Sequence, residues 1–403
     1  MKYVIIIGDG MSDFPVASLG GKTPLMVAKK PNIDKIARDG RTGQMETIPP
    51  ELPTGSDVAN LSVLGYDPRL CQGRGVIEAV SIGVNLSEDE VAMRCNLICI
   101  ENERVKNHSA GHISNEEGHK LIHFLNENLS SQRIRFYPGV SYRHLLVIKD
   151  ASAKLETFPP HDNVGANVEE VMIKGASPDA FQTAQEVAEL VKKSWALLEN
   201  HPVNVARKTS GKDPANSIWP WSPGKKPKMK TFQERFGISA AVISAVDLIK
   251  GLGIYAGMDI IEVKGATGLS DTNYEGKARA ALEALRNHDL VYVHVEATDE
   301  AGHSRDLGLK IRCIEYLDDR LVRPIFNGIE TLGLEASIAI LPDHPTPVEH
   351  GNHARALVPV AIWTSGKEGD SIDRFDEESV VKGSLGLMKG DKFIKTLLNL
   401  ETV

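Results

Sequence analysis

Two pairs of aspartate and histidine residues stand directly after apolar segments in the second half of the chain. The pairs are Asp299 with His303, after residues 290–295, and Asp343 with His344, after residues 336–341. Continuous apolar runs of this length are typical of strands buried in a parallel sheet, and open α/β sheets build their sites where such strands end. Carboxylate and imidazole groups together bind Mn²⁺, Zn²⁺, Mg²⁺ and similar ions. The two pairs therefore indicate two divalent ions.

The loop after the second pair carries one more candidate ligand. His353 lies nine residues beyond His344, after Gly351 and Asn352. Because Asp343 and His344 are adjacent, their side chains diverge unless a turn redirects them, and a proline on either side would rigidify such a loop. A single Asp/His pair at a strand end is common in proteins and often has no functional role. Two pairs in one chain favour a shared site.

An aspartate near the start of the chain has the same kind of setting. Asp9 follows the β-branched run 3–7 and lies between Gly8 and Gly10. The glycines let the backbone turn sharply and bring a carboxylate close to whatever lies above the sheet. The alternative is a structural aspartate that caps a turn, and this segment alone does not decide between the two.

Ser56 stands where a loop is predicted to lead into a helix. It follows Gly55 and opens an apolar-periodic segment, so free backbone amides and the helix dipole would favour an anion there. A serine at this position can be an N-cap and nothing more. The alternative is a nucleophile, because a metal-bound hydroxyl loses its proton readily and attacks phosphorus. Taken alone the segment favours the cap, and the aspartates and histidines farther along shift the balance to the nucleophile.

Length and composition limit the class of protein. The chain has 403 residues, 41% of them hydrophobic and 25% charged, which predicts a soluble globular protein of two domains. The net charge of −8 argues against nucleic acid as a partner, and the basic stretch 224–230 is short and interrupted by proline.

The cellular setting follows from the cysteines and the apolar runs. No run reaches membrane-spanning length, and the apolar start is too short for a signal peptide, so we expect a cytoplasmic protein that binds no membrane. Cys71, Cys95, Cys99 and Cys313 lack the spacing of a zinc finger. Cys95 and Cys99 are predicted to be small buried hydrophobic residues. All thiols of the chain are expected to be reduced.

Apolar periodicity predicts a doubly wound, mostly parallel sheet that is interrupted by an inserted α+β domain. The core should comprise 1–71 and 231–403, and the inserted domain 72–230. In the core we expect strands at 3–7, 240–244, 258–263, 290–295, 336–341 and 358–363, helices at 31–37, from 56, from 246 and at 276–285, and a long helix from 309 with a kink or end at Pro324. In the insertion we expect helices at 115–129 and 183–198, strands at 133–137 and 144–148, and a loop at 218–224.

Four segments carry a resemblance to a known family. They are Ile-Gly-Asp-Gly-Met at 7–11, Leu-Pro-Thr-Gly-Ser-Asp-Val-Ala-Asn at 52–60, Asp-Glu-Ala-Gly-His at 299–303 and Asp-His-Pro-Thr-Pro at 343–347. In order and type the chain resembles the cofactor-independent phosphoglycerate mutases of the archaeal type, within the alkaline phosphatase superfamily, over nearly its full length. The resemblance implies an alkaline phosphatase-like core and two divalent ions, with manganese first and zinc, magnesium or cobalt as alternatives. It assigns one ion to Asp9, Ser56, Asp343 and His344, and the other to Asp299, His303 and His353.

The resemblance also implies a reaction. Ser56 would attack the phosphoryl group of phosphoglycerate to give a phosphoserine, and the retained glycerate would take the phosphoryl group back on its other hydroxyl. The enzyme would thus be an isomerase of glycolysis that interconverts 2-phosphoglycerate and 3-phosphoglycerate without bisphosphoglycerate. The inserted domain would act as a lid that keeps water away from the phosphoserine until the phosphoryl group returns to glycerate.

The inserted domain should also hold the substrate carboxylate. Arg94, His112 and Arg143 are the candidates, since arginine matches a carboxylate or phosphate with two hydrogen bonds. Surface salt bridges are the alternative for both arginines. The segment 105–112 has histidines where the family is expected to have arginines, which leaves the phosphoryl acceptor open.

Two alternative functions remain at this stage. Some bacterial members of the family have been proposed to be homoserine kinases, which would use the same Ser56 and metals with a different lid. A non-catalytic scaffold stabilised by metal is the third interpretation. It is disfavoured because a structural metal site does not need a serine in the position of a nucleophile.

Overall fold

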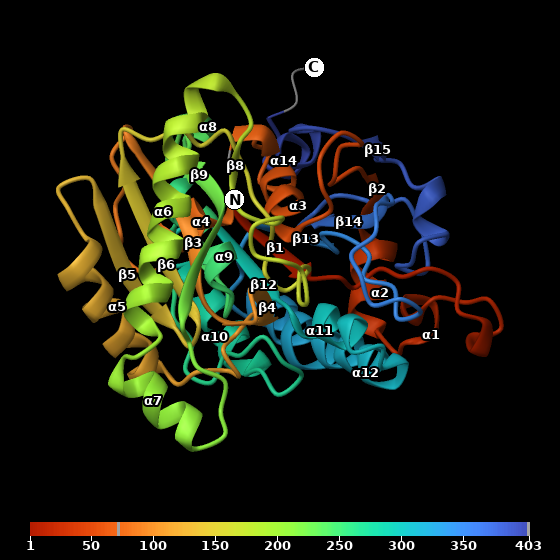
Figure 1. Ribbon diagram of the computed structural model, residues 1–403. Coiled ribbons are helices and arrows are strands. Elements are labelled where there is room, and N and C mark those ends of the chain that lie inside the picture. The colour runs from red at the N-terminus through yellow and green to blue at the C-terminus, as the bar shows by residue number, and fades with distance from the viewer. Residues whose placement is uncertain (71–72, 401–403) are drawn as a thin grey trace. The chain divides into compact units, whose positions relative to one another are not determined.

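The central strand of the larger sheet is β1 (Lys2–Gly8), which is buried at every position from Tyr3 to Gly8. The computed structural model describes residues 1–70 and 73–400, and Figure 1 labels their helices and strands. The chain forms two compact units: unit 1 comprises Met1–Leu70 and Met229–Val403, and unit 2 comprises Cys71–Lys228. Cys71, where the predicted core ended, lies outside the described residues.

Unit 1 contains an eight-stranded, mostly parallel sheet. In spatial order its strands are β11 (Asp259–Ile260), β10 (Ala240–Ile243), β12 (Leu290–Val295), β1, β13 (Ala336–Leu341), β14 (Val358–Thr364), β2 (Arg41–Met45) and β15 (Gly386–Met388). The first five run parallel, β14 is antiparallel to both of its neighbours, and β15 is parallel to β2. β11 is shorter than predicted because it is an edge strand that pairs with only two residues of β10.

The register of the three central strands determines what lies at their ends. Ile7 of β1 pairs with His294 of β12 on one side and with Leu341 of β13 on the other. Since the three strands are parallel and nearly level, the residues that follow them come together at one edge of the sheet. Those residues include Asp9, Asp299 and Asp343.

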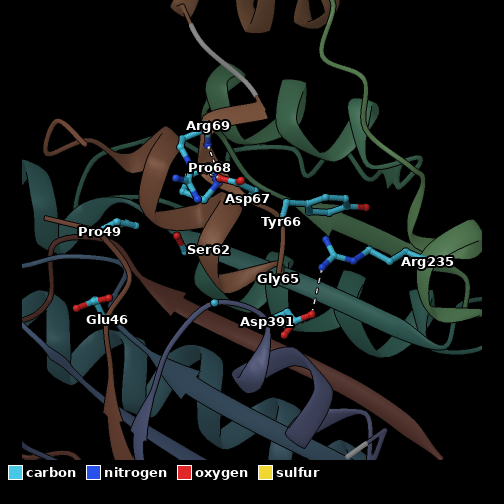
Figure 2. Close-up of a pocket in the computed structure, with 11 residues that line it drawn as sticks. Glu46, Pro49, Ser62, Gly65, Tyr66, Asp67, Pro68, Arg69, Arg235 and Asp391 are labelled. Carbon is cyan, nitrogen blue, oxygen red and sulfur yellow. Dashed lines mark hydrogen bonds and ion pairs between the residues drawn. The ribbon is translucent and has the colours of Figure 1, made fainter. Parts of the chain in front are cut away.

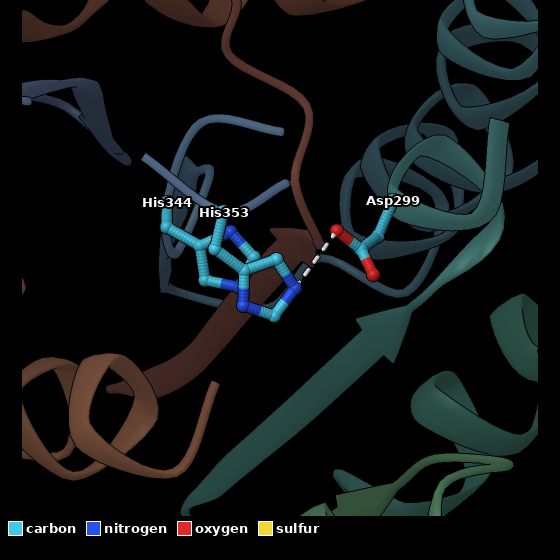
Figure 3. A group of neighbouring side chains, drawn as sticks. All are labelled: Asp299, His344 and His353. Carbon is cyan, nitrogen blue, oxygen red and sulfur yellow. Dashed lines mark ion pairs between the residues drawn. The ribbon is translucent and has the colours of Figure 1, made fainter. Parts of the chain in front are cut away.

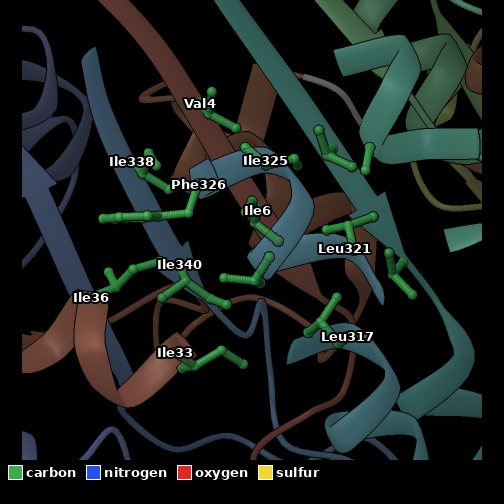
Figure 4. Close-up of a cluster of buried hydrophobic side chains, with 14 of the residues drawn as sticks. Val4, Ile6, Ile33, Ile36, Leu317, Leu321, Ile325, Phe326, Ile338 and Ile340 are labelled. Carbon is green, nitrogen blue, oxygen red and sulfur yellow. The ribbon is translucent and has the colours of Figure 1, made fainter. Parts of the chain in front are cut away.

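The helices of unit 1 cover this sheet. They are α1 (Pro24–Val27), α2 (Pro31–Asp39), α3 (Ser56–Val63), α8 (Phe232–Phe236), α9 (Asp247–Tyr255), α10 (Tyr274–Ala284), α11 (Ala297–His303), α12 (Leu307–Leu317), α13 (Arg323–Thr331) and α14 (Lys392–Leu397). The predicted kink is present, because a π-helical segment at Asp318–Val322 separates α12 from α13 and Pro324 lies in the first turn of α13. On one face of the sheet Val4, Ile6, Ile338 and Ile340 form a cluster with residues of α2, α10, α12 and α13, part of which Figure 4 shows.

Unit 2 is built on a five-stranded antiparallel sheet. Its strands are β3 (Glu90–Glu101), β4 (Arg104–Asn107), β5 (Ile134–Val140), β6 (Arg143–Lys149) and β9 (Ser217–Lys225), and a separate pair is formed by β7 (Leu155–Glu156) and β8 (Lys174–Gly175). Its helices are α4 (Arg74–Ser81), α5 (Asn115–Leu129), α6 (Phe181–Leu198) and α7 (Pro202–Thr209). The unit has its own buried apolar core.

The loop predicted at 218–224 is wrong, because these residues lie in β9. Among the described strands β9 pairs only with β3, and an edge strand tolerates proline since one side of it needs no N–H donors. Trp219 and Trp221 flank Pro220, so the two-residue period of the strand places both indoles on one face. Trp219 donates to the Phe158 carbonyl (2.8 Å) and Trp221 to Asn96 Oδ1 (3.1 Å), and both rings are buried in the core of unit 2.

Two predictions about the chain as a whole can be compared with the structure. Cys95, Cys99 and Cys313 are buried, and none of them forms a disulfide within the described part of the chain. Among the same residues, no helix has the length and apolar character needed to cross a membrane.

The core of unit 1 should be sensitive to loss of volume. Ile340 is fully buried in β13, and Ile340→Ala removes apolar contacts and leaves a cavity, so we expect it to lower the free energy of unfolding by about 2–5 kcal/mol. The matched control is Ile254→Ala in α9, where the side chain is 37% exposed and the change should be within about 0.5 kcal/mol. Urea unfolding followed by circular dichroism measures both, and equal losses would contradict the assigned packing.

Candidate metal centre

The fold of unit 1 brings the candidate ligands together from four segments. Asp9 follows β1, and Asp343 and His344 follow β13. α11 begins two residues after β12 and places Asp299 and His303 one turn apart on the same helix face. Ser56 is the first residue of α3, after Gly55 in an extended conformation, so it stands at a helix N-terminus as predicted.

Asp299 and two histidines form the first cluster, part of which is drawn in Figure 3. His303 Nε2 lies 3.0 Å from Asp299 Oδ2 and 3.0 Å from His353 Nε2, and His353 Nε2 lies 3.5 Å from Asp299 Oδ1. His303 Nδ1 is 2.8 Å from the Gly351 carbonyl, which fixes the ring. The ring nitrogens of two histidines thus point at the same small space beside a carboxylate, which is the arrangement that a divalent ion requires.

His344 connects this cluster to a second one, which comprises Asp9, Ser56 and Asp343. Its ring lies 4.0 Å from the ring of His353, and Nε2 lies 3.1 Å from Ser56 Oγ and 3.5 Å from Asp9 Oδ1. Nε2 also lies 3.6 Å from Asp343 Oδ2. The side chains of the adjacent residues 343 and 344 are therefore redirected into one site, as a shared role requires.

The carboxylate of Asp343 is almost fully hydrogen-bonded by protein groups. Oδ1 accepts from the backbone amides of Gly10 (3.0 Å) and His344 (2.9 Å), and Oδ2 accepts from Asn60 Nδ2 (2.8 Å). Since a carboxylate offers about four lone-pair positions, one position on Oδ2 remains for a cation. Asp343 can therefore bind one ion through one oxygen.

Asp9 has the opposite character. Its side chain is buried, and Oδ1 has no hydrogen-bond partner among the described residues. Burial raises the pKa of Asp9, and the nearby carboxylates of Asp343, Asp299 and Glu296 raise it further. A buried carboxylate with an unsatisfied oxygen beside others of the same charge needs positive charge, so the residues present fit a centre of divalent cations.

In the part of the chain that the structure describes, three further combinations of side chains have ligand atoms close enough to share an ion. They are Asp299, His344 and His353; Asp9, His294 and Asp343; and Asp9, Glu296 and Asp299, with all ligand atoms of a group within 4.8 Å of one another. The sequence reasoning missed His294 and Glu296. A histidine inside an otherwise apolar strand, two residues before the acid that follows the strand, is the signal that could have found them.

A buried hydrogen-bond network through Asn60 fixes the position of Ser56 relative to Asp343. Asn60, one turn along α3, donates through Nδ2 to the Ser56 carbonyl (2.7 Å) as well as to Asp343, and its Oδ1 accepts from the Tyr292 hydroxyl. Asn60 and Tyr292 are both buried. Burial raises the pKa of Tyr292 well above its ordinary value, as do the charges of Asp343 and Asp9, so the phenol stays a donor.

The comparisons with known proteins show the family of this chain. The profile of the 2,3-bisphosphoglycerate-independent phosphoglycerate mutase family matches residues 37–204. A protein of that name from Methanosarcina barkeri is 52% identical over 401 residues, which are 99% of either chain. The chain belongs to this family. A relative from Geobacter sulfurreducens, described as a probable member, is 46% identical over 99% of this chain and 100% of its own.

Solved structures of relatives show the same fold over the whole chain. A protein of Pyrococcus horikoshii has a TM-score of 0.83 at 32% identity, covering 100% of this chain and 98% of that one. The cofactor-independent phosphoglycerate mutase of Thermoplasma acidophilum has a TM-score of 0.71 at 28% identity, covering 99% and 100%. The predicted family is confirmed by these relatives.

In unit 2 the structure gathers the three predicted substrate residues around two aromatic rings. Arg94 lies over the Trp221 ring (5.0 Å) and 3.3 Å from Glu78, and Arg143 lies over the Tyr142 ring (5.8 Å). The ring of His112 is 6.1 Å from that of Tyr142.

The buried guanidinium of Arg94 has an unsatisfied donor. Nε makes no hydrogen bond within the described chain. Burial lowers the pKa of Arg94, the charge of Glu78 raises it, and the charges of Arg143 and Arg74 lower it again. Three arginines are thus close enough to repel one another, which is the electrostatic setting of an anion site. Sequence reasoning missed Arg74, and also His161, whose ring packs on Trp221.

A strained loop presents His112. Ala110, Gly111 and His112 all have positive φ (47°, 64° and 52°), which is costly for the two residues that carry a Cβ. Arg207 holds the loop, because its buried guanidinium donates to the Ala110 carbonyl (2.6 Å) and to Glu117 (2.6 Å). Backbone strain of this kind is typical of functional sites.

A separate pocket of about 290 Å³ in unit 1 contains none of the predicted site residues (Figure 2). Its two arginines are already paired, Arg235 with Asp391 (3.5 Å) and Arg69 with Asp67 (2.9 Å). Arg235 also lies over the Tyr66 ring (4.8 Å). The pocket therefore offers no unpaired charge for a phosphorylated substrate.

Metal binding should release protons at neutral pH. In the metal-free protein the hydrogen bond to Asp299 raises the pKa of His303 to about 9, although burial opposes this shift. A metal needs the neutral imidazole, so binding at pH 7.5 displaces a proton, and the apparent affinity should rise with pH until about pH 9. Titration calorimetry with Mn²⁺ in buffers of different ionisation enthalpy measures the release. His303→Gln should reduce it, and no release at pH 7.5 would contradict the protonated state.

Proposed function

We propose that this protein interconverts 2-phosphoglycerate and 3-phosphoglycerate without bisphosphoglycerate, by phosphoryl transfer through a phosphoserine at Ser56. Membership of the family supports the reaction. The observation that carries the mechanism is the position of Ser56 Oγ, which lies at the start of a helix and 3.1 Å from His344 Nε2. A hydroxyl with no catalytic role does not need to face a cluster of buried carboxylates and imidazoles.

The proposed ligand sets follow the two clusters. Asp9, Ser56, Asp343 and His344 would hold one divalent ion, and Asp299, His303 and His353 would hold the other, with manganese as the first expectation. Two bound ions would supply positive charge that lowers the pKa of the serine hydroxyl and offsets charge on the phosphoryl oxygens. The distances of 3.0–3.6 Å among these side chains support the assignment.

The serine and its helix carry the covalent step. Ser56 Oγ loses its proton and forms a bond to phosphorus while the bond from phosphorus to the glycerate oxygen breaks, and that oxygen takes up one proton. The free amides at the start of α3 donate toward the phosphoryl oxygens, as helix N-termini do for anions. In the return step the other glycerate hydroxyl loses its proton and bonds to phosphorus, while the bond from phosphorus to Ser56 Oγ breaks and Oγ takes up a proton, so protons and electrons balance over the cycle.

Unit 2 is proposed to be the lid that retains glycerate between the two steps. Arg94, Arg143 and His112 would bind the carboxylate and hydroxyl groups of glycerate. The unsatisfied Nε of buried Arg94 and the strained backbone of His112 support this assignment. Exclusion of water is essential, because water in place of glycerate would hydrolyse the phosphoserine and make the enzyme a phosphatase.

Replacing Ser56 should abolish transfer and leave the fold intact. We expect Ser56→Ala to lower mutase activity at least about 10³-fold with Mn²⁺ and 3-phosphoglycerate, because no other hydroxyl replaces the nucleophile. Ser62 is also in α3, but its hydroxyl donates to the Val58 carbonyl (3.1 Å), so Ser62→Ala is the control and should keep most of the activity. Retained activity in Ser56→Ala would remove this residue from the mechanism.

A second assay separates the mutase from a kinase of the same family. The unchanged protein is offered homoserine with ATP and Mn²⁺, and we expect no phosphohomoserine. Turnover in that assay alone, with none on 3-phosphoglycerate, would refute the proposed function.

Arg94 should act mainly on substrate affinity. Arg94→Met removes the guanidinium and keeps a side chain with part of the apolar stem, so we expect KM for 3-phosphoglycerate to rise at least about tenfold. Arg104→Met is the control, since Arg104 is exposed in the same unit and donates to the Gly165 carbonyl (2.7 Å). An unchanged KM in Arg94→Met would contradict the substrate-binding role and leave Arg94 with a structural role, its ion pair with Glu78.

A further inference from the structure

His294 is a fully buried histidine whose position the fold alone does not explain. In β12 the side chains of Val291, Val293 and Val295 pack into the apolar core, so the two-residue period places Tyr292 and His294 on the opposite face. His294 pairs in register with Ile7 of β1, two residues before Asp9. A histidine at this position costs desolvation that an apolar residue would not, so its polar atoms need partners.

The ring nitrogen that faces the site has no protein partner. His294 Nε2 lies 3.0 Å from Asp9 Oδ2, yet neither His294 Nε2 nor Asp9 Oδ1 makes a hydrogen bond in the part of the chain that the structure describes. Two atoms that bind one ion at about 2.0–2.1 Å lie roughly 3 Å apart in octahedral geometry and roughly 3.4 Å apart in tetrahedral geometry. The separation of His294 Nε2 and Asp9 Oδ2 therefore fits two ligands of one cation. The unsatisfied Nε2 and Oδ1 favour a shared cation over a hydrogen bond between the two side chains.

A third ligand atom completes the group. The ligand atoms of Asp9, His294 and Asp343 all lie within 4.8 Å of one another. Asp343 has one lone-pair position left on Oδ2 after its bonds to Gly10, His344 and Asn60. One carboxylate oxygen each from two aspartates and one imidazole nitrogen form a donor set typical of manganese or zinc.

The other ring nitrogen of His294, Nδ1, lies near a hydrogen-bond partner, as is usual for a histidine that binds a metal. Nδ1 lies 3.3 Å from Ser244 Oγ, and the same oxygen accepts the backbone amide of Val246 (3.0 Å), which keeps the hydroxyl in place. Lys277 donates to the His294 carbonyl (2.9 Å). If Nδ1–H donates to Ser244, the lone pair of Nε2 is free to face the site, which is the tautomer that a ligating histidine needs.

We propose that His294 is a ligand of the metal centre and binds, together with Asp9 and Asp343, the ion next to Ser56. The inference rests on the proposed function only for the presence of that ion. It adds a ligand that the two Asp/His pairs of the sequence do not contain. The competing interpretation is that His294 only donates a hydrogen bond to Asp9 and orients it.

The test is Mn²⁺ binding to protein first freed of metal with a chelator, followed by the electron spin resonance signal of free Mn²⁺. His294→Phe keeps a ring and removes both nitrogens. His294→Gln keeps a side-chain amide that can donate to Asp9. We expect Kd for one of the bound ions to rise at least about tenfold in both variants, because both lose the imidazole ligand.

A third variant leaves the histidine in place. Ser244→Ala removes the group that orients Nδ1, and we expect it to raise the same Kd about tenfold. Circular dichroism of the metal-free proteins shows whether each variant is folded. If His294→Phe does not fold, His294→Gln and Ser244→Ala still decide the question.

The outcomes separate the two roles. A raised Kd in both His294 variants, together with loss of one coupled imidazole nitrogen in pulsed electron spin resonance of the bound Mn²⁺, supports the ligand. An unchanged Kd in His294→Gln beside a raised one in His294→Phe would show a hydrogen-bond donor and overturn the inference, as would an unchanged Kd in both. Mutase activity of the unchanged protein is measured separately, so failure of the proposed function is seen on its own.

Discussion

The structure depends on how three carboxylates are accommodated at the ends of three adjacent parallel strands. N–H donors stabilise Asp343 and two imidazoles stabilise Asp299, whereas Asp9 Oδ1 has no hydrogen-bond partner among the described residues. Burying such charge without compensation costs several kcal/mol per group. Cations are the remaining source of compensation, so the same groups that would carry the chemistry also couple metal binding to the stability of the sheet edge.

The parallel core was predictable because buried parallel strands leave a continuous apolar signal. Residues 290–295 and 336–341 were predicted as strands and are β12 and β13 to the residue. The Asp/His pairs after them indicated the metal centre for the same reason, since strand ends meet at one edge of such a sheet. The candidate ligands are therefore placed by local patterns that one sequence contains.

Elements defined by their partners were not predictable in this way. β9 contains two prolines and is a strand only because β3 lies beside it, and β2 (Arg41–Met45) is too polar to stand out as a buried strand. His294 was hidden inside an apolar run, and Asn60 reads as an ordinary helix residue. Their importance comes from tertiary contacts, to Asp9 and to Asp343 respectively, which no spacing along the chain reveals.

The loop that presents His112 has a consequence for how members of this family diverge. Its backbone is fixed by contacts that do not involve the two histidine rings: Arg207 bonds the carbonyl of Ala110, and Asn107 accepts the amide of Ser109 (2.9 Å). The side chains of His108 and His112 can therefore be replaced while the backbone of the loop keeps its conformation. If this loop contacts glycerate as proposed, exchange of the two side chains would change the phosphoryl acceptor without rearranging the main chain or the candidate metal centre.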